Sequence, residues 1–137
     1  MELENDTIRL LLGYENFYHT TSLENSVKID LEGLLPNKYP DFQYLSFAPR
    51  KDAFICLCPY AKLEGWKSTL RDMHNDIVVY SIKAEDIVKM DIGFDWTMQG
   101  IHTIIDKPQP IQFEQSLKKL GTIVSFQHIP PNLLNKL

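Results

Sequence analysis

One stretch, Phe17–Pro36, constrains the fold of this chain more than any other. Its first two residues are aromatic and favour a β-strand. Thr21 or Ser22 can accept hydrogen bonds from the first free N–H groups of a helix, and Gly33 suits the left-handed residue that ends one. The sequence therefore predicts a strand that passes directly into a helix. His19 lies at the junction, where a ligand can meet backbone N–H groups and the positive end of the helix dipole.

The predicted helix also carries an apolar pattern. Leu23, Val27 and Leu31 stand at positions i, i+4 and i+8, so they fall on one helical face.

Composition narrows the class of protein. A chain of 137 residues suits one domain, and its 44% hydrophobic and 23% charged residues are ordinary for a soluble globular protein. No run of about 18 apolar residues is present, so no membrane span is expected. Glu2, Glu4 and Asp6 carry the wrong charge for a signal or transit peptide, which predicts a cytoplasmic location. The net charge of −4 argues against general attraction to nucleic acid but leaves a local basic groove open.

Short strands and helices alternate along the rest of the chain, which predicts an α+β fold. Residues 7–12 fit either a strand or a helical turn, and residues 59–73 fit either a helix or a long lid. His74, in a polar turn, is expected to be solvated. The remaining predictions are a loop over 37–41, strands over 43–47, 77–82 and 122–126 (the last strand), further pairing near 90–92 and 104–105, a helical turn over 83–88, a helix over 113–120 ended by Gly121, and a short helix over 132–137.

The run from Ala53 to Cys58 is continuously apolar, which is typical of a strand or a helix buried on both sides. A helix beginning near Pro49 is favoured, because proline is well tolerated in a first turn. Cys56 and Cys58 are interpreted as buried structural thiols. With no Cys or His pair at metal spacing elsewhere, no metal site is predicted.

Three segments together resemble the ADP-ribosyltransferases. Tyr18–Thr21 with Gly33–Leu35 is similar to their first motif, in which a His-x-Thr ends the first strand and a helix leading to Gly-Leu follows. Tyr44–Arg50 resembles the aromatic strand and Pro-Arg turn of the DNA-targeting ADP-ribosyltransferase toxins, the DarT-like group. Thr122–Pro131 resembles their last core strand and its exit. The order and spacing of the three segments extend the resemblance over nearly the whole chain.

The resemblance implies a fold and an activity. The fold would be one ADP-ribosyltransferase-like domain over residues 1–137, with a split β-sheet core and short helices. NAD would bind as co-substrate in a cleft between two short sheets. The domain would transfer ADP-ribose to a macromolecular acceptor, protein or nucleic acid, and release nicotinamide. An antitoxin or a target protein would be a further partner.

The resemblance also implies roles for single residues. A guanidinium presents a fixed fork of donors that suits phosphate oxygens. The implied roles are His19 holding NAD near the nicotinamide ribose, Thr20 or Thr21 near the same ribose, Arg50 facing the pyrophosphate or the transition state, and Tyr44 or Phe47 stacking on the nicotinamide.

One position departs from the family pattern. The glutamate that would stabilise the oxocarbenium-like transition state is replaced by Thr122, which cannot supply a negative charge. Glu114, in the preceding predicted helix, is the nearest candidate for the catalytic carboxylate. Two alternatives therefore stay open. One is a catalytically degenerate ADP-ribosyltransferase fold that serves as a protein-binding module, and the other is an unrelated α+β interaction protein.

Overall fold

The structure is a computed structural model that describes residues 3–36, 54–94 and 109–137. These residues form an α+β fold with five α-helices and two small antiparallel sheets of three strands each. The predicted α+β class is confirmed at this level. The predictions for residues 37–41, 43–47 and 104–105 lie outside the described residues, as do Tyr44, Phe47 and Arg50.

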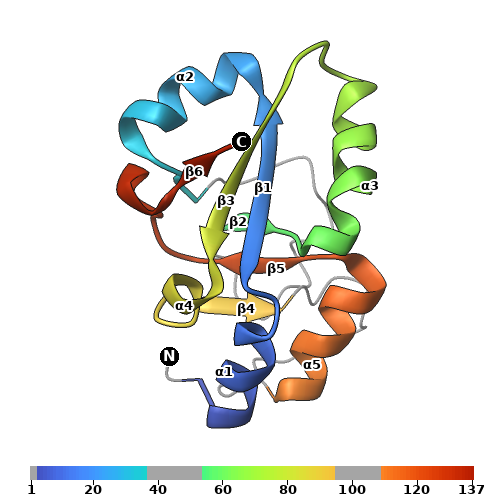
Figure 1. Cartoon of the computed structure of the whole chain (residues 1–137), viewed down its shortest axis with the longest axis vertical. Coiled ribbons are helices and arrows are strands. Elements are labelled where there is room, and N and C mark those ends of the chain that lie inside the picture. The colour runs from blue at the N-terminus through green and yellow to red at the C-terminus, as the bar shows by residue number, and fades with distance from the viewer. Residues whose placement is uncertain (1–2, 37–53, 95–108) are drawn as a thin grey trace.

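The first sheet has the strand order β1-β3-β6. β1 (Asn16–Ser22) pairs with β3 (Ile77–Lys83) over its whole length, from Asn16 opposite Lys83 to Ser22 opposite Ile77. β6 (Asn135–Lys136) completes the other edge of β3. Helices α2 (Leu23–Glu32) and α3 (Tyr60–Arg71) both contact β1 and β3 and flank them in Figure 1.

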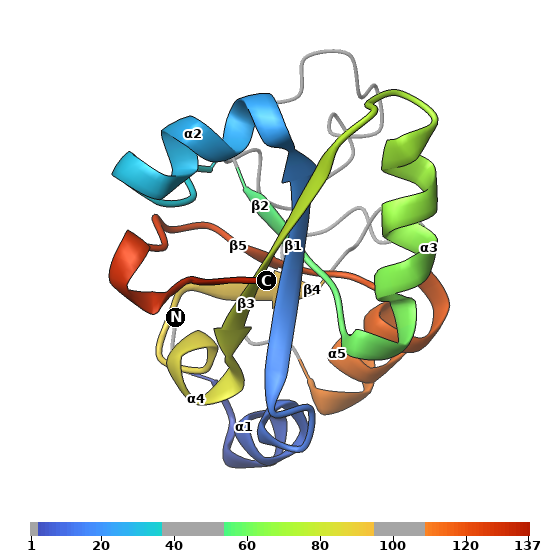
Figure 2. The same ribbon diagram turned by 45° about the horizontal axis from the view of Figure 1, so that its top comes forward.

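The second sheet has the order β2-β5-β4 and consists of three-residue strands. Its strands are β2 (Ile55–Leu57), β4 (Ile92–Phe94) and β5 (Ile123–Ser125). In Figures 1 and 2, β1 and β3 run across β4 and β5. The sheets meet where Tyr18 of β1 and Cys58, just after β2, exchange two backbone hydrogen bonds of 2.8 Å.

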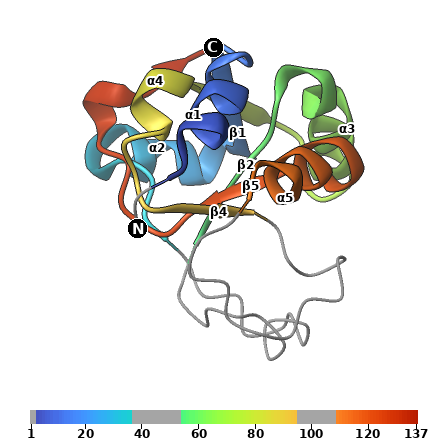
Figure 3. The same cartoon turned by 90° about the horizontal axis from the view of Figure 1, so that it is seen from below.

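The remaining helices cover the second sheet. α1 (Asn5–Leu12) contacts both α4 (Ala84–Ile87) and α5 (Pro110–Gln115), and Figure 3 shows α1 and α4 on the same side of β4. The main core lies between these helices and the two sheets. Its fully buried residues include Leu11, Phe17, Leu57, Ile82, Ile87, Ile92, Phe113, Leu117, Ile123 and Ile129.

The strand-to-helix prediction around His19 is confirmed, with one difference at Gly33, whose ψ of −170° is not that of a left-handed helical residue. The Ser22 hydroxyl oxygen caps α2 by accepting a hydrogen bond from the N–H of Asn25 at 3.2 Å. α2 ends at Gly33, whose φ of 81° favours glycine. A Cβ atom there would lie 2.2 Å from the carbonyl oxygen of Ile129, so only glycine fits this close approach.

The regularly spaced apolar residues of α2 are exposed and not buried. Leu23, Val27 and Leu31 do share one face, but they are 49%, 64% and 80% exposed. Instead, the helix buries Ser26, and it is held to the sheet by Tyr80, whose hydroxyl lies 2.7 Å from Asp30 Oδ1 and 3.2 Å from the Ser26 carbonyl oxygen. The three residues form what we call the α2 apolar stripe.

Several predicted elements are corrected. The favoured helix beginning near Pro49 is wrong over residues 55–57, which form the strand β2: this strand pairs with β5, and Cys58, just after it, pairs with Tyr18 of β1. The short helix over 132–137 is also wrong, since the structure has a 3-10 turn, η3 (Pro131–Leu133), followed by β6, so β5 is not the last strand. The helix over 113–120 begins earlier, at Pro110, and its last turn is a π-helix, η2 (Ser116–Leu120), which Gly121 ends in the left-handed conformation.

Two open alternatives are resolved. Residues 7–12 belong to the helix α1, and residues 60–71 form the helix α3. Three short predictions are close to what is observed: β3, the helical turn α4, and further pairing near residue 92, where β4 lies.

Candidate functional site

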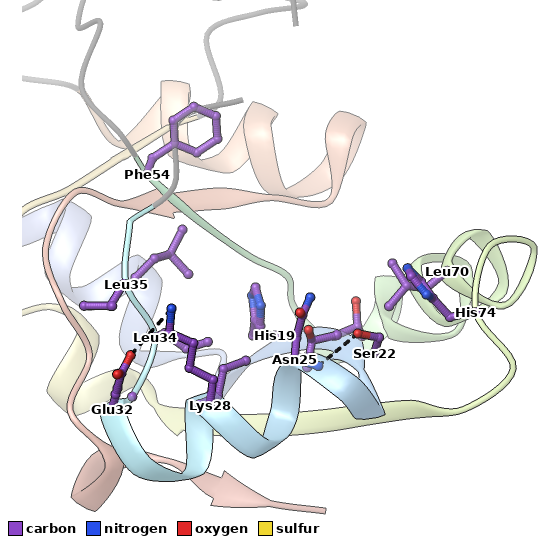
Figure 4. A pocket seen from close by; sticks show the side chains of 15 residues that line it. His19, Ser22, Asn25, Lys28, Glu32, Leu34, Leu35, Phe54, Leu70 and His74 are labelled. Carbon is purple, nitrogen blue, oxygen red and sulfur yellow. Dashed lines mark hydrogen bonds and ion pairs between the residues drawn. The ribbon is translucent and has the colours of Figure 1, made fainter. Parts of the chain in front are cut away.

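A pocket of about 360 Å³ lies where the two sheets meet, alongside α2. Its walls come from the end of β1, from the pocket-facing side of α2, from residues 33–35, and from Phe54 and Ile55 at the start of β2. Leu70 and His74, at the end of α3, close one side. Figure 4 shows these side chains, with His19 near the middle of the group. The volume is within the range of small-molecule sites, roughly 300–1,000 Å³.

His19 is fixed in this pocket by one hydrogen bond. Its ring nitrogen Nδ1 lies 2.9 Å from the carbonyl oxygen of Cys56 on the neighbouring sheet. A carbonyl can only accept, so Nδ1 carries the proton, and in the neutral ring Nε2 is then an acceptor. Burial lowers the pKa of His19, although the bond to Cys56 acts in the opposite direction. The ring is therefore predominantly neutral at pH 7 and can accept a hydrogen bond from a ligand hydroxyl.

The end of the pocket near the start of α2 is polar and electropositive. Thr21 and Ser22 are the last two residues of β1, and Asn25 lies in the first turn of α2. Two N–H groups in the first turn already have partners, because Leu23 N–H donates to the Asp76 carbonyl oxygen and Asn25 N–H donates to the Ser22 hydroxyl oxygen. An anion at this end would therefore be attracted mainly by the positive end of the helix dipole. His74 lies at the same end, close to Ser22 in Figure 4. This combination suits a phosphate group.

The opposite end of the pocket is apolar and carries an acid. Leu34, Leu35 and Phe54 line it, and Glu32 is the acidic side chain among the lining residues that the structure describes. Lys28 lies one turn earlier on α2, with its Nζ 3.9 Å from Glu32 Oε2. This wall is held in place by backbone bonds of 2.9 Å in both directions between Leu34 and Ile129.

The residues predicted from the sequence divide into two groups. His19, Thr20 and Thr21 line the pocket together. Glu114 does not line it: it lies on α5, where its carboxylate accepts a 2.6 Å hydrogen bond from Lys118. Thr122, at the position of the family glutamate, is buried and its carbonyl oxygen accepts a hydrogen bond from the Ser116 hydroxyl.

Several pocket residues escaped the sequence analysis. Asn25, Lys28 and Glu32 form a polar stripe on α2 at spacings of three and four. The signal was present, because residues three and four apart share a helical face. It was hidden by the more conspicuous apolar pattern of the same helix. His74 was expected only to be solvated, and it is exposed, but it also lines the pocket.

The two cysteines are thiols and not a disulfide. Cys58 is buried, and burial raises its pKa to about 12, so it is not a reactive thiol. Cys56 is half-buried, and its carbonyl oxygen accepts the hydrogen bond from His19 Nδ1. Within residues 3–36, 54–94 and 109–137, no three His, Cys, Asp or Glu side chains are grouped as a metal ion would require.

Across the described part of the chain, no helix has the length and apolar character needed to cross a membrane. Comparisons with protein-family models, with curated proteins and with solved structures found no match to this chain.

Proposed function

We propose that this chain is an ADP-ribosyltransferase-like domain that binds NAD in the pocket beside His19. The observation that carries the proposal is the location of this pocket. It lies where two three-stranded sheets meet, and the His-x-Thr of the resemblance forms part of its wall. A split sheet with His19 at the junction is the arrangement that the resemblance implies.

The chemistry of the pocket suits the parts of NAD. The neutral His19 ring and the hydroxyls of Thr20 and Thr21 can hydrogen-bond to ribose hydroxyls. The start of α2 can bind pyrophosphate oxygens, and the exposed Lys28 side chain, whose Nζ lies 3.9 Å from Glu32 Oε2, would turn its ammonium toward them. Under this proposal Arg50, Tyr44 and Phe47, which lie outside the described residues, keep the roles that the resemblance implies.

The proposal also includes the transfer reaction, which fewer observations support than support NAD binding. ADP-ribose would pass from NAD to a protein or nucleic-acid acceptor, and nicotinamide would leave. Positive charge develops on the ribose in this reaction, and a preorganised partner for such charge is worth on the order of 10²–10³-fold in rate. Glu114 is bonded to Lys118 and does not line the pocket, so the geometry gives it no support as that partner.

The test is a calorimetric titration of the protein with NAD. The proposal expects saturable binding that His19→Ala and Lys28→Gln both weaken. Because the Lys28 side chain is exposed, loss of its phosphate contact should cost about 1 kcal/mol. Lys89→Gln is the matched control, because Lys89 is an exposed lysine just after α4 and does not line the pocket. Absence of binding by the folded wild type would overturn the proposal.

Turnover is tested separately by measuring nicotinamide release with candidate protein and nucleic-acid acceptors. Because Glu114 does not line the pocket and is bonded to Lys118, Glu114→Gln should release nicotinamide at the wild-type rate. A strong loss of activity in Glu114→Gln would instead assign the catalytic carboxylate to α5.

A second candidate function is a catalytically degenerate fold that serves as a protein-binding module. The α2 apolar stripe favours it, because three aligned apolar residues on one exposed helix face are typical of helix-mediated recognition. This candidate predicts NAD binding, if any, without nicotinamide release. Catalytic release of nicotinamide by the wild type would exclude it.

A further inference from the structure

The two ends of the pocket differ in their chemistry, and Glu32, with Lys28 Nζ 3.9 Å from it, is the acidic side chain among the described lining residues. The end near Ser22 and Asn25 is polar and electropositive, whereas the other end combines Glu32 with the apolar side chains of Leu35 and Phe54. Figure 4 shows His19 between these two ends. A ligand that carries an anion at one end and a flat, cationic ring at the other would match this arrangement.

Glu32 occupies a position that does not favour an acid. It is in the last turn of α2, where the exposed carbonyl groups carry a partial negative charge, and this turn contains no basic residue. A carboxylate there is mildly destabilising unless something positive lies near it. Residues that break a local rule of this kind are often found at functional sites.

The positive groups near Glu32 leave its carboxylate able to accept a further partner. Lys28 Nζ lies 3.9 Å away, and the two side chains are 75% and 50% exposed, so this pair is weak. The His128 ring approaches only the Glu32 backbone, with Nε2 2.6 Å from the carbonyl oxygen.

We propose that Glu32 recognises the positive charge of the nicotinamide ring of NAD. This inference rests on the proposed function, since it assigns one end of the same pocket. The ring would lie against Leu35 and Phe54, with its charge toward the Glu32 carboxylate. The ribose would then lie near His19 and the pyrophosphate toward the start of α2. Glu32 thus acts as a specificity-determining residue that distinguishes oxidised from reduced cofactor.

The experiment compares ligands that differ in this charge. Affinities for NAD⁺, NADH and ADP-ribose are measured by calorimetry for the wild type, Glu32→Gln and Glu24→Gln. NAD⁺ carries the cationic ring, NADH carries a neutral one, and ADP-ribose has none. Glu24→Gln is the matched control, because it makes the same charge change on the same helix at a residue that does not line the pocket.

The expected result is a loss confined to one variant and one ligand. Glu32→Gln should bind NAD⁺ about fivefold more weakly, as expected for one exposed charge pair, and should bind NADH and ADP-ribose within about twofold of the wild type. Glu24→Gln removes a charge from the first turn of α2, near the proposed pyrophosphate, so it should change the affinities for all three ligands by the same small factor. Because Glu32 is exposed, the variant is expected to fold, and circular dichroism with a thermal melt verifies this.

Each other outcome has a definite meaning. If Glu32→Gln weakens all three ligands equally, or none of them, the role of Glu32 is overturned while the proposed function stands. Equal losses in Glu24→Gln and Glu32→Gln would also overturn it, because a general effect of net charge would then suffice. If the folded wild type binds none of the three ligands, the proposed function fails, and the inference fails with it.

Discussion

Helix α2 and the helical segment formed by α5 and η2 carry the same apolar pattern with opposite outcomes. Phe113 and Leu117 stand at i and i+4 and are 0% and 1% exposed, whereas every residue of the α2 apolar stripe is at least 49% exposed. The difference comes from what the fold brings against each helix. α5 is covered by α1 and β4, with the rings of Phe113 and Phe94 6.1 Å apart, edge to face.

α2 packs Ile29 against the core and is also held to its sheet by polar groups. Tyr80 reaches Asp30 and the Ser26 carbonyl, and Lys136 of β6 lies 2.8 Å from the second oxygen of Asp30. The comparison teaches that helical period identifies a face but not the surroundings of that face. It also predicts that equivalent substitutions in the two helices have very different energetic effects.

The largest effect is expected in the buried helical segment. Leu117→Ala should lower the free energy of unfolding by about 2–5 kcal/mol, because it removes buried methyl groups and leaves a cavity. Urea denaturation measures the change. A loss below about 1 kcal/mol would contradict the packing described for η2.

A smaller effect is expected where α2 meets the sheet. Tyr80→Phe removes the hydroxyl that lies 2.7 Å from Asp30 Oδ1, and it should cost about 1–2 kcal/mol in urea denaturation. Tyr60→Phe serves as the control, because Tyr60 is exposed and its hydroxyl should contribute little. Equal effects of the two substitutions would show that Tyr80 does not anchor α2.

The ion pair between Asp30 of α2 and Lys136 should make the free energy of unfolding depend on pH. Hydrogen bonds from Lys136 and then from Tyr80 lower the pKa of Asp30 in the folded state. The stabilisation is therefore complete above the unfolded pKa of about 3.9 and is lost as the pH falls through the lower folded value. The stability difference between wild type and Asp30→Asn should be constant above about pH 5 and shrink toward acid pH. A difference that stays constant into acid would contradict this assignment.

The smallest effect is expected in the α2 apolar stripe. Leu31→Ala should change the free energy of unfolding by no more than about 0.5 kcal/mol, because the side chain is already in water and alanine favours a helix. It is the matched counterpart of Leu117→Ala, with the same chemical change at a different depth. A cost above about 2 kcal/mol would mean that the stripe is buried in solution.

The parts of the fold that depend on short-range signals were predictable. Ser22 and Gly33 fix the ends of α2 through local caps, and the strand over 77–82 was found from its run of residues with high β-propensity, which includes Ile77, Val78 and Val79. β2 was not, because a short apolar run without alternation has no period that separates strand from helix. The two-residue strand β6 depends entirely on its pairing with β3, which no local signal reports.

The residues of the candidate site divide in the same way, into those that short-range signals identify and those that depend on how distant segments pack. His19, Thr20 and Thr21 were found because one strand-to-helix junction holds all three. Glu114 was chosen for its place in the chain, but its distance from the pocket depends on how α5 packs, which the sequence does not reveal. Glu32 was missed because the apolar pattern of α2 hid the polar stripe to which it belongs, and because Phe54, at the same end of the pocket, comes from a distant segment.

The order of strands in the two sheets affects how the molecule unfolds and whether its fragments can fold. The sheets draw alternately on the chain: β1, β3 and β6 form one, and β2, β4 and β5 form the other. No continuous piece of the sequence therefore contains a whole sheet without strands of the other. A cut anywhere between β2 and β5 divides both sheets and should leave fragments that cannot fold alone, and the described core should unfold in one cooperative step. The pocket, whose walls come from both sheets, can then form only when most of the chain has folded.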